Sequence, residues 1–407
     1  MNPAPALRRR DELTHKGNLR ETRYGWLRLT PAYSVHLVTE LLERHTKDGA
    51  RVLDPFCGTG TTALVCAERG LACDTTDINP FLQWLARAKT RKYSPRDLAD
   101  FERASARVLD AVSEASAAPP WTPPLHRIEK WWDRDTLAAL GRALAAVESA
   151  GASEATTDLL RVVFCRVMID RANVSFNHQS MSFKKTDASP PGAVAAVTEA
   201  WRRTATVIAR GASSPLRSSP RVIHCDARDL RSALDPGAYG CVITSPPYPN
   251  RMSYIRELRP YMYWLKYLGD GRAAGELDWR AIGGTWGCAT SNVAKWQPDT
   301  PGGVAFAGFD ALRAAIGEKS ETLARYVHKY FYDMTAHCAG LYAVVAPGAT
   351  VHYIVGNSKF YDVVLPVEAI FAALFTAAGF RDARVETIRK RTSKKELYEF
   401  VVSARKP

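Results

Sequence analysis

Two consecutive stretches near the start of the chain each place a short apolar run before a helical pattern. In "GARVLDPFCGTGTTALVCAERG" (49–70), Val52 and Leu53 precede a glycine-rich turn, and helical periodicity follows. "LACDTTDINPFLQWLARAK" (71–89) repeats this order, with a strand that ends near Asp77. Strands that alternate with helices predict an α/β domain with a parallel sheet and helices on its faces.

The pattern extends on both sides of this unit. "LTPAYSVHLVTELLERH" (29–45) predicts a helix with Thr30 as its N-cap and Pro31 at its first position. Strands return in "PRVIHCDARDL" (220–230) and "GCVITSPPY" (240–248). Further on, the pattern predicts a helix over about 320–343, a strand in 348–356, a helix in 365–380 and a terminal two-stranded ribbon at the sheet edge.

Two segments interrupt this alternation. Residues 95–215 are rich in Ala and Arg and predict a helical insertion, and residues 269–318 are expected to be an irregular insertion. The resulting division is 1–94 (N-terminal segment and first half of the α/β domain), 95–215, 216–268 (second half), 269–318, and 319–407 (end of the α/β domain).

Composition and charge narrow the class of protein. The 407 residues are 46% hydrophobic and 24% charged, which is ordinary for a globular protein, but the net charge is +13. Such an excess favours a polyanionic partner such as nucleic acid, and a basic surface that only aids solubility is the alternative. The N-terminus has no apolar core of a signal peptide, and no apolar run is long enough to span a membrane. We therefore expect a cytoplasmic protein.

The eight cysteines include no CxxC pair and no Cys/His cluster with zinc-ligand spacing. Reduced, mostly buried thiols and no bound metal are therefore expected.

Three predicted strands end on residues suited to a nucleotide-like ligand. Gly58 and Gly60 allow a close approach of the backbone to a ligand, although a tight turn would also need them. Asp77 lies 17 residues after Gly60, where a carboxylate can accept both hydroxyls of a ribose. Asp226, after the third strand, could accept a hydrogen bond from an adenine amino group. For both aspartates, a helix N-cap is the structural alternative.

The fourth strand ends in "VITSPPYPNR" (242–251). Prolines cannot continue a sheet ladder, so the strand must stop at about Ser245. Taken alone, the stretch is either a rigid turn or a polar and aromatic pocket at the carboxyl end of a strand, where open α/β sheets bind ligands.

Together, "LDPFCGTGTT", Asp77 and Ser-Pro-Pro-Tyr resemble the motifs of amino-group DNA methyltransferases in the order cofactor motif, then catalytic motif. The resemblance covers about residues 14–94, 216–265 and 320–407. It implies a Rossmann-like methyltransferase fold: a mostly parallel seven-stranded sheet with a terminal antiparallel hairpin, here with a helical insertion. It also implies S-adenosylmethionine as the cofactor, without a metal. The implied cofactor residues are Thr30, Pro31, Ala32, Asp54, Phe56, Gly58, Gly60, Thr61, Thr62, Asp77, Ile78, Asp226 and Ala227.

The same resemblance assigns catalysis to Ser245, Pro246, Pro247 and Tyr248. Ser245 Oγ and the Pro246 carbonyl would accept the two protons of the target amine, and the prolines would keep both acceptors fixed. Tyr248 would stack on a base flipped out of the duplex. The loop has no cysteine nucleophile, which a C5-cytosine enzyme would need. The Ser form of the motif is associated with the N4 amine of cytosine, and the Asp and Asn forms mostly with adenine.

The resemblance makes double-stranded DNA the expected partner in a bacterial or archaeal cell. A cognate restriction endonuclease and a homodimer are compatible with it. An adenine-N6 or RNA base methyltransferase, or a relative that binds nucleic acid without catalysis, are the alternatives. Candidate DNA contacts lie in two polar, basic segments and beside the catalytic motif: Arg171, Asn173, Asn177, His178, Gln179, Lys184, Lys185, Asn250, Arg251, Lys394 and Lys395. A polar loop and a solvated turn are the alternatives for the two segments. His178 has no partner at metal-ligand spacing.

Overall fold

The computed structural model describes residue 18 and residues 23–29, 32–114, 121–175, 182–183, 192–250, 253–285, 288–299, 303–391 and 396–407. Thr30, Pro31, Asn177, His178, Gln179, Lys184, Lys185, Arg251, Lys394 and Lys395 lie outside these residues.

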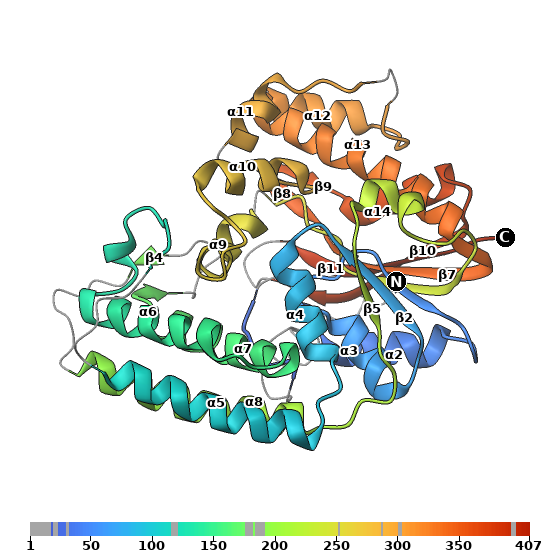
Figure 1. Ribbon diagram of the computed structural model, residues 1–407. Helices are drawn as coiled ribbons and strands as arrows, with labels where there is room; N and C mark the ends of the chain where they lie inside the picture. Colours follow the sequence, from blue (N-terminus) through green and yellow to red (C-terminus); the bar gives the residue numbers. More distant parts are fainter. Residues whose placement is uncertain are drawn as a thin grey trace.

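A seven-stranded sheet forms the centre of the molecule (Figure 1). Its strands are β1 (Val52–Asp54), β2 (Cys73–Asp77), β5 (Arg221–His224), β6 (Tyr239–Thr244), β7 (Val345–Gly356), β10 (Arg381–Lys390) and β11 (Tyr398–Arg405). The order is β10-β11-β7-β6-β1-β2-β5, and β11 alone runs in the opposite direction to the other six strands. The prediction of a mostly parallel sheet with a terminal hairpin at its edge is confirmed.

Alternate residues of the central strands face two different helical layers. Val52 and Ile243 pack against α2 (Val35–His45) and α3 (Thr61–Arg69). Leu53 and Val242 pack on the opposite side, in the core formed with the helices α13 (Glu321–Val344) and α14 (Val367–Ala377). A strand with both faces buried reads as a continuous apolar run, which is why the sequence pattern identified these strands.

The helix α2 begins later than predicted. Ser34 is its N-cap, because its side chain accepts a hydrogen bond from Leu37 N while its own backbone is extended. The prediction of Thr30 as N-cap was therefore wrong. Leu37 N belongs to the first turn, whose N–H groups have no carbonyl partner within the helix, and a hydroxyl three residues earlier is the usual cap for such a group.

The insertion after α4 (Pro80–Thr90) forms a helical bundle with its own core. It contains α5 (Pro95–Ser113), η2 (Ile128–Lys130), α6 (Arg134–Ser149), α7 (Glu154–Asp170), the short strands β3 (Val174–Ser175) and β4 (Ser182–Phe183), and α8 (Ala193–Ala212). Buried tryptophans of the bundle continue into Trp264 of α9 (Tyr254–Trp264). The bundle is thus joined to the sheet domain through α4 and α9.

A buried arginine joins the segment before α2 to this bundle. The Arg23 guanidinium donates hydrogen bonds to the carbonyl oxygens of Lys89, Arg91, Gly211, Ala212 and Ser214 at 2.7–2.9 Å. These carbonyls lie at the ends of α4 and α8, where the last helical turns leave carbonyl oxygens without helical donors.

The expectation of an irregular segment over 269–318 was wrong. The segment contains α10 (Gly271–Arg280), α11 (Cys288–Lys295) and α12 (Phe309–Gly317), of which α11 and α12 pack on α13. The Asp270 side chain caps α10 by accepting from Ala273 N. The glycines that suggested irregular structure lie mainly in the connections between these helices, where the chain turns from one helix into the next.

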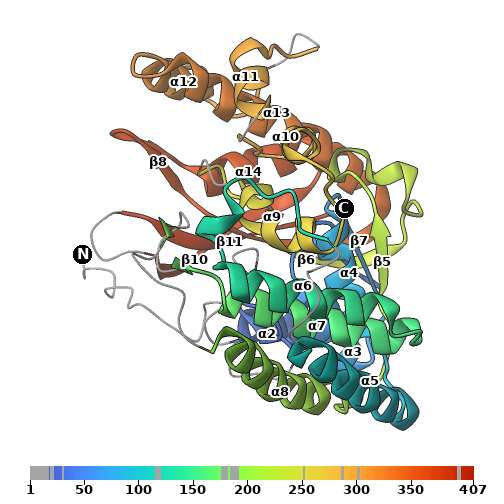
Figure 2. The ribbon, with the colours of Figure 1, turned by 60° about the vertical axis from the view of Figure 1, so that its left-hand side comes forward.

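The helical bundle of α5–α8 and the helices α10–α12 lie at opposite ends of the molecule, with α9 between them (Figure 2).

The remaining short strands, β8 (Ser358–Phe360) and β9 (Val363–Leu365), pair with each other next to the long strand β7. After β5 the chain forms the 3-10 helix η3 (Ala227–Ser232), which packs on α13.

Candidate active site

The four predicted strand-end residues lie at one edge of the sheet. Gly58, Asp77, Asp226 and Ser245 follow or end β1, β2, β5 and β6, which are neighbouring parallel strands. Because β2 and β6 flank β1 on opposite sides, the connections from β1 diverge at this point. That position is the topological switch point at which open α/β sheets bind ligands.

The glycine turn after β1 is held in a tight geometry. Gly58 and Gly60 have φ values of +51° and +77°, and residues with a side chain rarely adopt such positive values. A Cβ at Gly60 would lie 3.0 Å from Ala86 Cβ of α4, so only glycine allows this close approach. The buried Lys89 Nζ donates to the Thr59 carbonyl over 3.1 Å, and burial lowers its pKa to about 8.

Asp54, at the end of β1, is completely buried. Its carboxylate accepts hydrogen bonds from Thr244 Oγ1 (2.6 Å), Tyr33 OH (3.1 Å) and Phe56 N (3.1 Å). Tyr33 OH also contacts Thr62 Oγ1. Burial raises the pKa of Asp54 to about 6, because these hydrogen bonds only partly compensate for the lost hydration of the charge.

Asp77, at the end of β2, is partly exposed at the sheet edge. One carboxylate oxygen accepts from Gly58 N (3.0 Å) and the other from Asn79 N (2.8 Å). Burial raises the pKa of Asp77 to about 7, and the neighbouring charge of Asp54 adds to this shift. The carboxylate therefore connects the glycine turn to the end of the next strand.

Asp226 is held mainly by an arginine. Its carboxylate accepts from the backbone N–H and the guanidinium of Arg228, with an ion-pair distance of 2.6 Å. Burial acts to raise the pKa of Asp226, but Arg228 outweighs it and holds the pKa below its usual value. The capping alternative is thus present in the structure, as Asp226 is the N-cap of η3. The Ala227 carbonyl next to it contacts His337 Nδ1 at 2.7 Å.

The other cofactor residues differ in exposure. Phe56 is partly exposed, with its ring 4.8 Å from that of His337. Ala32 and Ile78 are also partly exposed, whereas Thr61 and Thr62 are buried. Thr61 and Thr62 are therefore packed in the interior next to the turn, whereas Phe56 and Ile78 are accessible beside it.

The loop after β6 is fixed by contacts from three other elements. Ser245 Oγ donates to the Ile354 carbonyl of β7 over 3.0 Å. The Pro247 carbonyl accepts from Tyr330 OH of α13 (2.6 Å), and Tyr248 N donates to Tyr254 OH of α9 (3.3 Å). The loop therefore has a defined conformation without any ligand.

The Tyr248 side chain is held by the terminal hairpin. Its hydroxyl donates to Glu399 Oε1 of β11 over 3.0 Å, and the Arg391 guanidinium lies 5.2 Å from its ring centroid. Burial and the nearby Glu399 charge raise the pKa of Tyr248 well above its usual value. The hydroxyl thus remains protonated and able to donate.

Among the described DNA-contact candidates, two are held within the bundle. Arg171 forms a 2.8 Å ion pair with Asp170, and Asn173 N donates to the Trp131 carbonyl over 2.7 Å. Asn250 N donates to the Tyr248 carbonyl over 2.8 Å, so Asn250 belongs to the loop after β6.

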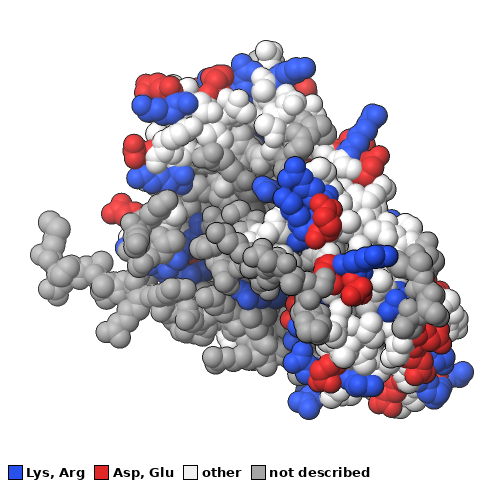
Figure 3. Space-filling model, turned by 90° about the vertical axis from the view of Figure 1, so that its left-hand side faces the viewer, with Lys and Arg blue, Asp and Glu red and all other residues white. Residues whose placement is uncertain are grey.

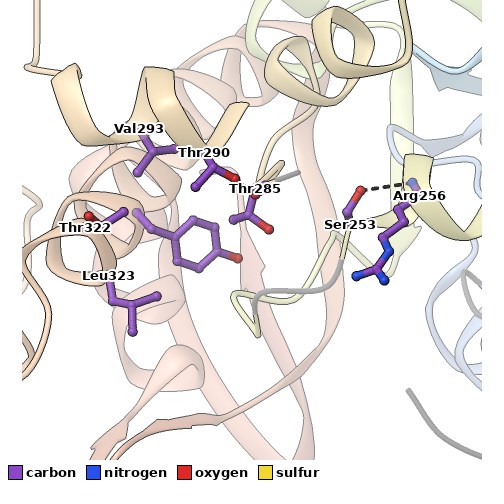
Figure 4. A pocket seen from close by; sticks show the side chains of 8 residues that line it. Ser253, Arg256, Thr285, Thr290, Val293, Thr322 and Leu323 are labelled. Atoms are coloured by element: carbon purple, nitrogen blue, oxygen red, sulfur yellow. Dashed lines mark hydrogen bonds between the residues drawn. The ribbon is translucent and has the colours of Figure 1, made fainter. Parts of the chain in front are cut away.

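A pocket of about 290 Å³ lies between α9, α11 and α13 (Figure 4). Ser253 and Arg256 form one side, and Thr285, Thr290 and Thr322 face them from the other. Gly283 connects this pocket to the catalytic loop, because a Cβ there would lie 3.7 Å from Tyr326 OH and 3.9 Å from Pro247 Cβ. Arg256 is exposed. Lys and Arg side chains are visible on the face of the molecule shown in Figure 3.

Known proteins resemble this chain in sequence. A family model described as DNA methylase matches residues 14–85. The chain is 23% identical to the Type II methyltransferase M.AvaI of Nostoc sp., over 92% of this chain and 82% of that protein. It is 21% identical to M.BsoBI of Geobacillus stearothermophilus, over 93% and 82%. M.MjaII of Methanocaldococcus jannaschii is 40% identical over 62 residues, which are 15% of this chain and 12% of that protein. The family-model match and the Type II methyltransferase relatives support an amino-group DNA methyltransferase family for this chain.

Members of this amino-group DNA methyltransferase family use S-adenosylmethionine as the methyl donor. The residues at the sheet edge fit such a molecule. Asp54 and Asp77 are carboxyls whose pKa is raised to about 6 and about 7, and their hydrogen-bond donors are hydroxyl and backbone N–H groups. A ligand that carries positive charge and hydroxyl donors would therefore stabilise their ionised forms.

Within the residues that the structure describes, no group of three His, Cys, Asp or Glu side chains could hold a metal ion. No helix in the described part of the chain is long and apolar enough to cross a membrane. The seven cysteines with described side chains are free and buried.

The sequence reasoning missed several residues of the site. Tyr33 and Thr244 hold Asp54, while Glu399 and Arg391 hold Tyr248. Tyr33 directly follows Ala32, which the resemblance assigns to the cofactor, so its hydroxyl was a usable signal. Glu399 has no local signal, because it reads as one residue of an ordinary strand.

Proposed function

We propose that this protein transfers a methyl group from S-adenosylmethionine to the exocyclic N4 amine of cytosine in double-stranded DNA. The observation that carries the proposal is the placement of Ser245 to Tyr248 at the sheet edge beside the glycine turn and Asp77. The choice of cytosine follows from the Ser form of the motif. The affinity of the chain for DNA is supported by its net charge of +13 and by its Type II methyltransferase relatives.

The geometry of Ser245 suits the role of an acceptor. Its hydroxyl hydrogen points to the Ile354 carbonyl, so the oxygen lone pairs remain available for a proton of the target amine. The Pro246 carbonyl is the second acceptor. Two accepted hydrogen bonds reduce the conjugation of the amine with its ring, and its lone pair can then attack the methyl carbon in line. The nitrogen gains the methyl group and loses one proton to solvent.

The cofactor supplies an activated methyl group on a sulfonium. We assign its ribose hydroxyls to Asp77, its adenine to the neighbourhood of Phe56, Ile78 and Asp226, and its methionine end to the side of Asp54. Because Arg228 engages both oxygens of Asp226, the adenine amino group would have to share this carboxylate with the arginine. The methionine end would then lie next to β6, since Thr244 of β6 donates a hydrogen bond to Asp54.

The pocket beside the catalytic loop supports a DNA contact. Arg256 provides a cation and Thr322 a hydroxyl, which are groups that hold phosphates of a nucleic-acid backbone, while the Thr290 hydroxyl donates to the Thr285 carbonyl. We therefore assign Arg256 to a phosphate near the target base. A cognate restriction endonuclease and a homodimer remain expectations from the resemblance.

Modification of host DNA tests this function directly. The chain, and in parallel its Ser245→Ala variant, would be expressed in a bacterial host that lacks DNA methylation. Sequencing that distinguishes N4-methylcytosine, N6-methyladenine and unmodified bases would then report the base and the site. N4-methylcytosine with the wild type alone is the expected result. N6-methyladenine would retain the mechanism and change the base, and unmodified DNA with an expressed, folded chain would refute the proposal.

A further inference from the structure

Besides Ser245 of its own loop, two residues of the terminal hairpin hold the Tyr248 side chain. The Tyr248 hydroxyl donates to Glu399 Oε1 over 3.0 Å, across 151 residues of sequence. The other oxygen of Glu399 accepts from Arg389 Nε at 2.7 Å, and both of these side chains are nearly buried. Glu399 therefore has a fixed position from which to hold the ring.

A second contact acts on the face of the same ring. The Arg391 guanidinium lies 5.2 Å from the Tyr248 ring centroid and is itself fixed by donating to the Asn357 carbonyl over 3.0 Å. There is no room between these groups and β7: a Cβ at Gly356 would lie 2.5 Å from Arg391 Nη1 and 3.0 Å from Tyr248 Cε2. Arg391 thus covers one face of the ring.

We propose that Glu399 and Arg391 are positioning residues that hold Tyr248 ready to stack on the target base. This inference rests on the proposed function. Stacking needs a ring with a fixed plane and a free face, and an aromatic side chain that is free to rotate loses entropy when the base arrives. Glu399 fixes the rotation of the ring through its hydroxyl, and Arg391 supports one face so that the base stacks on the other.

A double-mutant cycle isolates the contact between Glu399 and the Tyr248 hydroxyl. The experiment compares the wild type with Glu399→Gln, Tyr248→Phe and the double variant in single-turnover methyl transfer. The substrate is a duplex that contains the recognition site identified by sequencing the host DNA. We expect Glu399→Gln to reduce the rate about tenfold, as for the loss of a hydrogen bond to a charged group. In the Tyr248→Phe background the same substitution should have little effect, because the hydroxyl that it acts through is gone.

Three further readouts separate positioning from general damage to the fold. Fluorescence of a duplex with 2-aminopurine at the target position should show less extruded base in Glu399→Gln than in the wild type. S-adenosylmethionine affinity should not change, whereas the melting temperature should fall equally with Tyr and with Phe at position 248, because Glu399→Gln also removes the nearly buried ion pair with Arg389. Glu386→Gln is the matched control, because Glu386 is an exposed residue of the same hairpin. It should retain the wild-type rate.

Arg391→Lys tests the contact on the ring face. Lysine retains the charge but has no planar group to lie against the ring, so the 2-aminopurine signal should fall while cofactor affinity is unchanged. An unchanged signal and rate in Arg391→Lys, or an equal effect of Glu399→Gln with Tyr and with Phe at position 248, would overturn the inference. A wild type that methylates no DNA would instead overturn the proposed function and this inference with it.

Discussion

The turn after β1 and the loop after β6 end neighbouring strands of one sheet, but their side-chain partners lie at different distances along the chain. Asp77 accepts from Gly58 N, 19 residues away, and from Asn79 N, two residues away. Ser245 instead contacts Ile354, 109 residues on, and Tyr248 contacts Glu399, 151 residues on. Thr244 links the two regions through its hydrogen bond to Asp54.

We call the region of Asp54, the glycine turn and Asp77 the cofactor half, and the loop after β6 with its partners the target half. The difference in sequence distance explains why the cofactor half is easier to detect from the sequence. A contact within one βαβ unit closes a short loop, whereas the target half forms only when β7, α13 and the hairpin are in place. The matched family model, which covers residues 14–85, spans the cofactor half only. Substitutions should therefore separate the two halves, with cofactor affinity reporting on one and methyl transfer on the other.

The largest separation is expected from Ser245→Ala. Removing one preorganised hydrogen-bonding group typically reduces the rate by about 10²–10³. The cofactor half does not depend on this hydroxyl, so calorimetry should give wild-type affinity for S-adenosylmethionine. Single-turnover methyl transfer beside calorimetry measures both quantities. Wild-type transfer by the variant would mean that Ser-Pro-Pro-Tyr is only a turn.

Asp77→Ala should give the opposite result. It removes the acceptor of the ribose hydroxyls, and a hydrogen bond to a charged group contributes about 1.5–3 kcal/mol, or roughly tenfold to a hundredfold in affinity. Asp235→Ala is the matched control, because Asp235 is exposed in the loop before β6, at the other edge of the sheet. Equal cofactor affinities for a folded Asp77→Ala protein and the control would contradict the assignment.

The pH dependence of cofactor affinity should come from the cofactor half alone. Burial raises the pKa of Asp54 to about 6 and that of Asp77 to about 7 in the free protein. A cofactor that binds their ionised forms must displace these protons at low pH, so affinity should be constant well above pH 7 and should weaken, by about tenfold per pH unit for one proton, as pH falls through 7 and 6. Calorimetry between pH 5.5 and about 8.5 measures this trend. In Asp77→Asn the weakening near pH 7 should disappear, and a retained slope would exclude Asp77 as its source.

The smallest effect is expected at the pocket lined by Arg256, which we assign to a DNA phosphate. Arg256→Ala should lower DNA affinity and reduce the slope of log affinity against log salt by about 0.9, the value for one phosphate contact. Arg272→Ala is the control: it removes the same charge from α10, where Arg272 is exposed and pairs with Glu276 at 2.8 Å. Binding titrations at several salt concentrations would compare the two. Equal slopes in both variants would remove Arg256 from the interface.

Fold and site were predictable to different extents. The apolar strands, the glycine turn and Asp77 were visible because each depends on residues close in sequence. The three helices over 271–317 were missed, because the glycines between them dominated the pattern of short elements. Asp226 was assigned to adenine with capping as its rival, and the structure adds Arg228, two residues on, as a competing partner that the sequence alone did not rank.

What the sequence determined by itself is the alternation of strands and helices in the α/β domain, the four strand-end residues and their common edge. These follow from local periodicity and from the rule that parallel strands end at one edge. Only the tertiary structure decided that Tyr33 and Thr244 meet Asp54, that Arg23 joins α4 to α8, and that Glu399 and Arg391 hold Tyr248. The physical reason is that such contacts depend on the packing of several elements, which no local pattern of polar and apolar residues encodes.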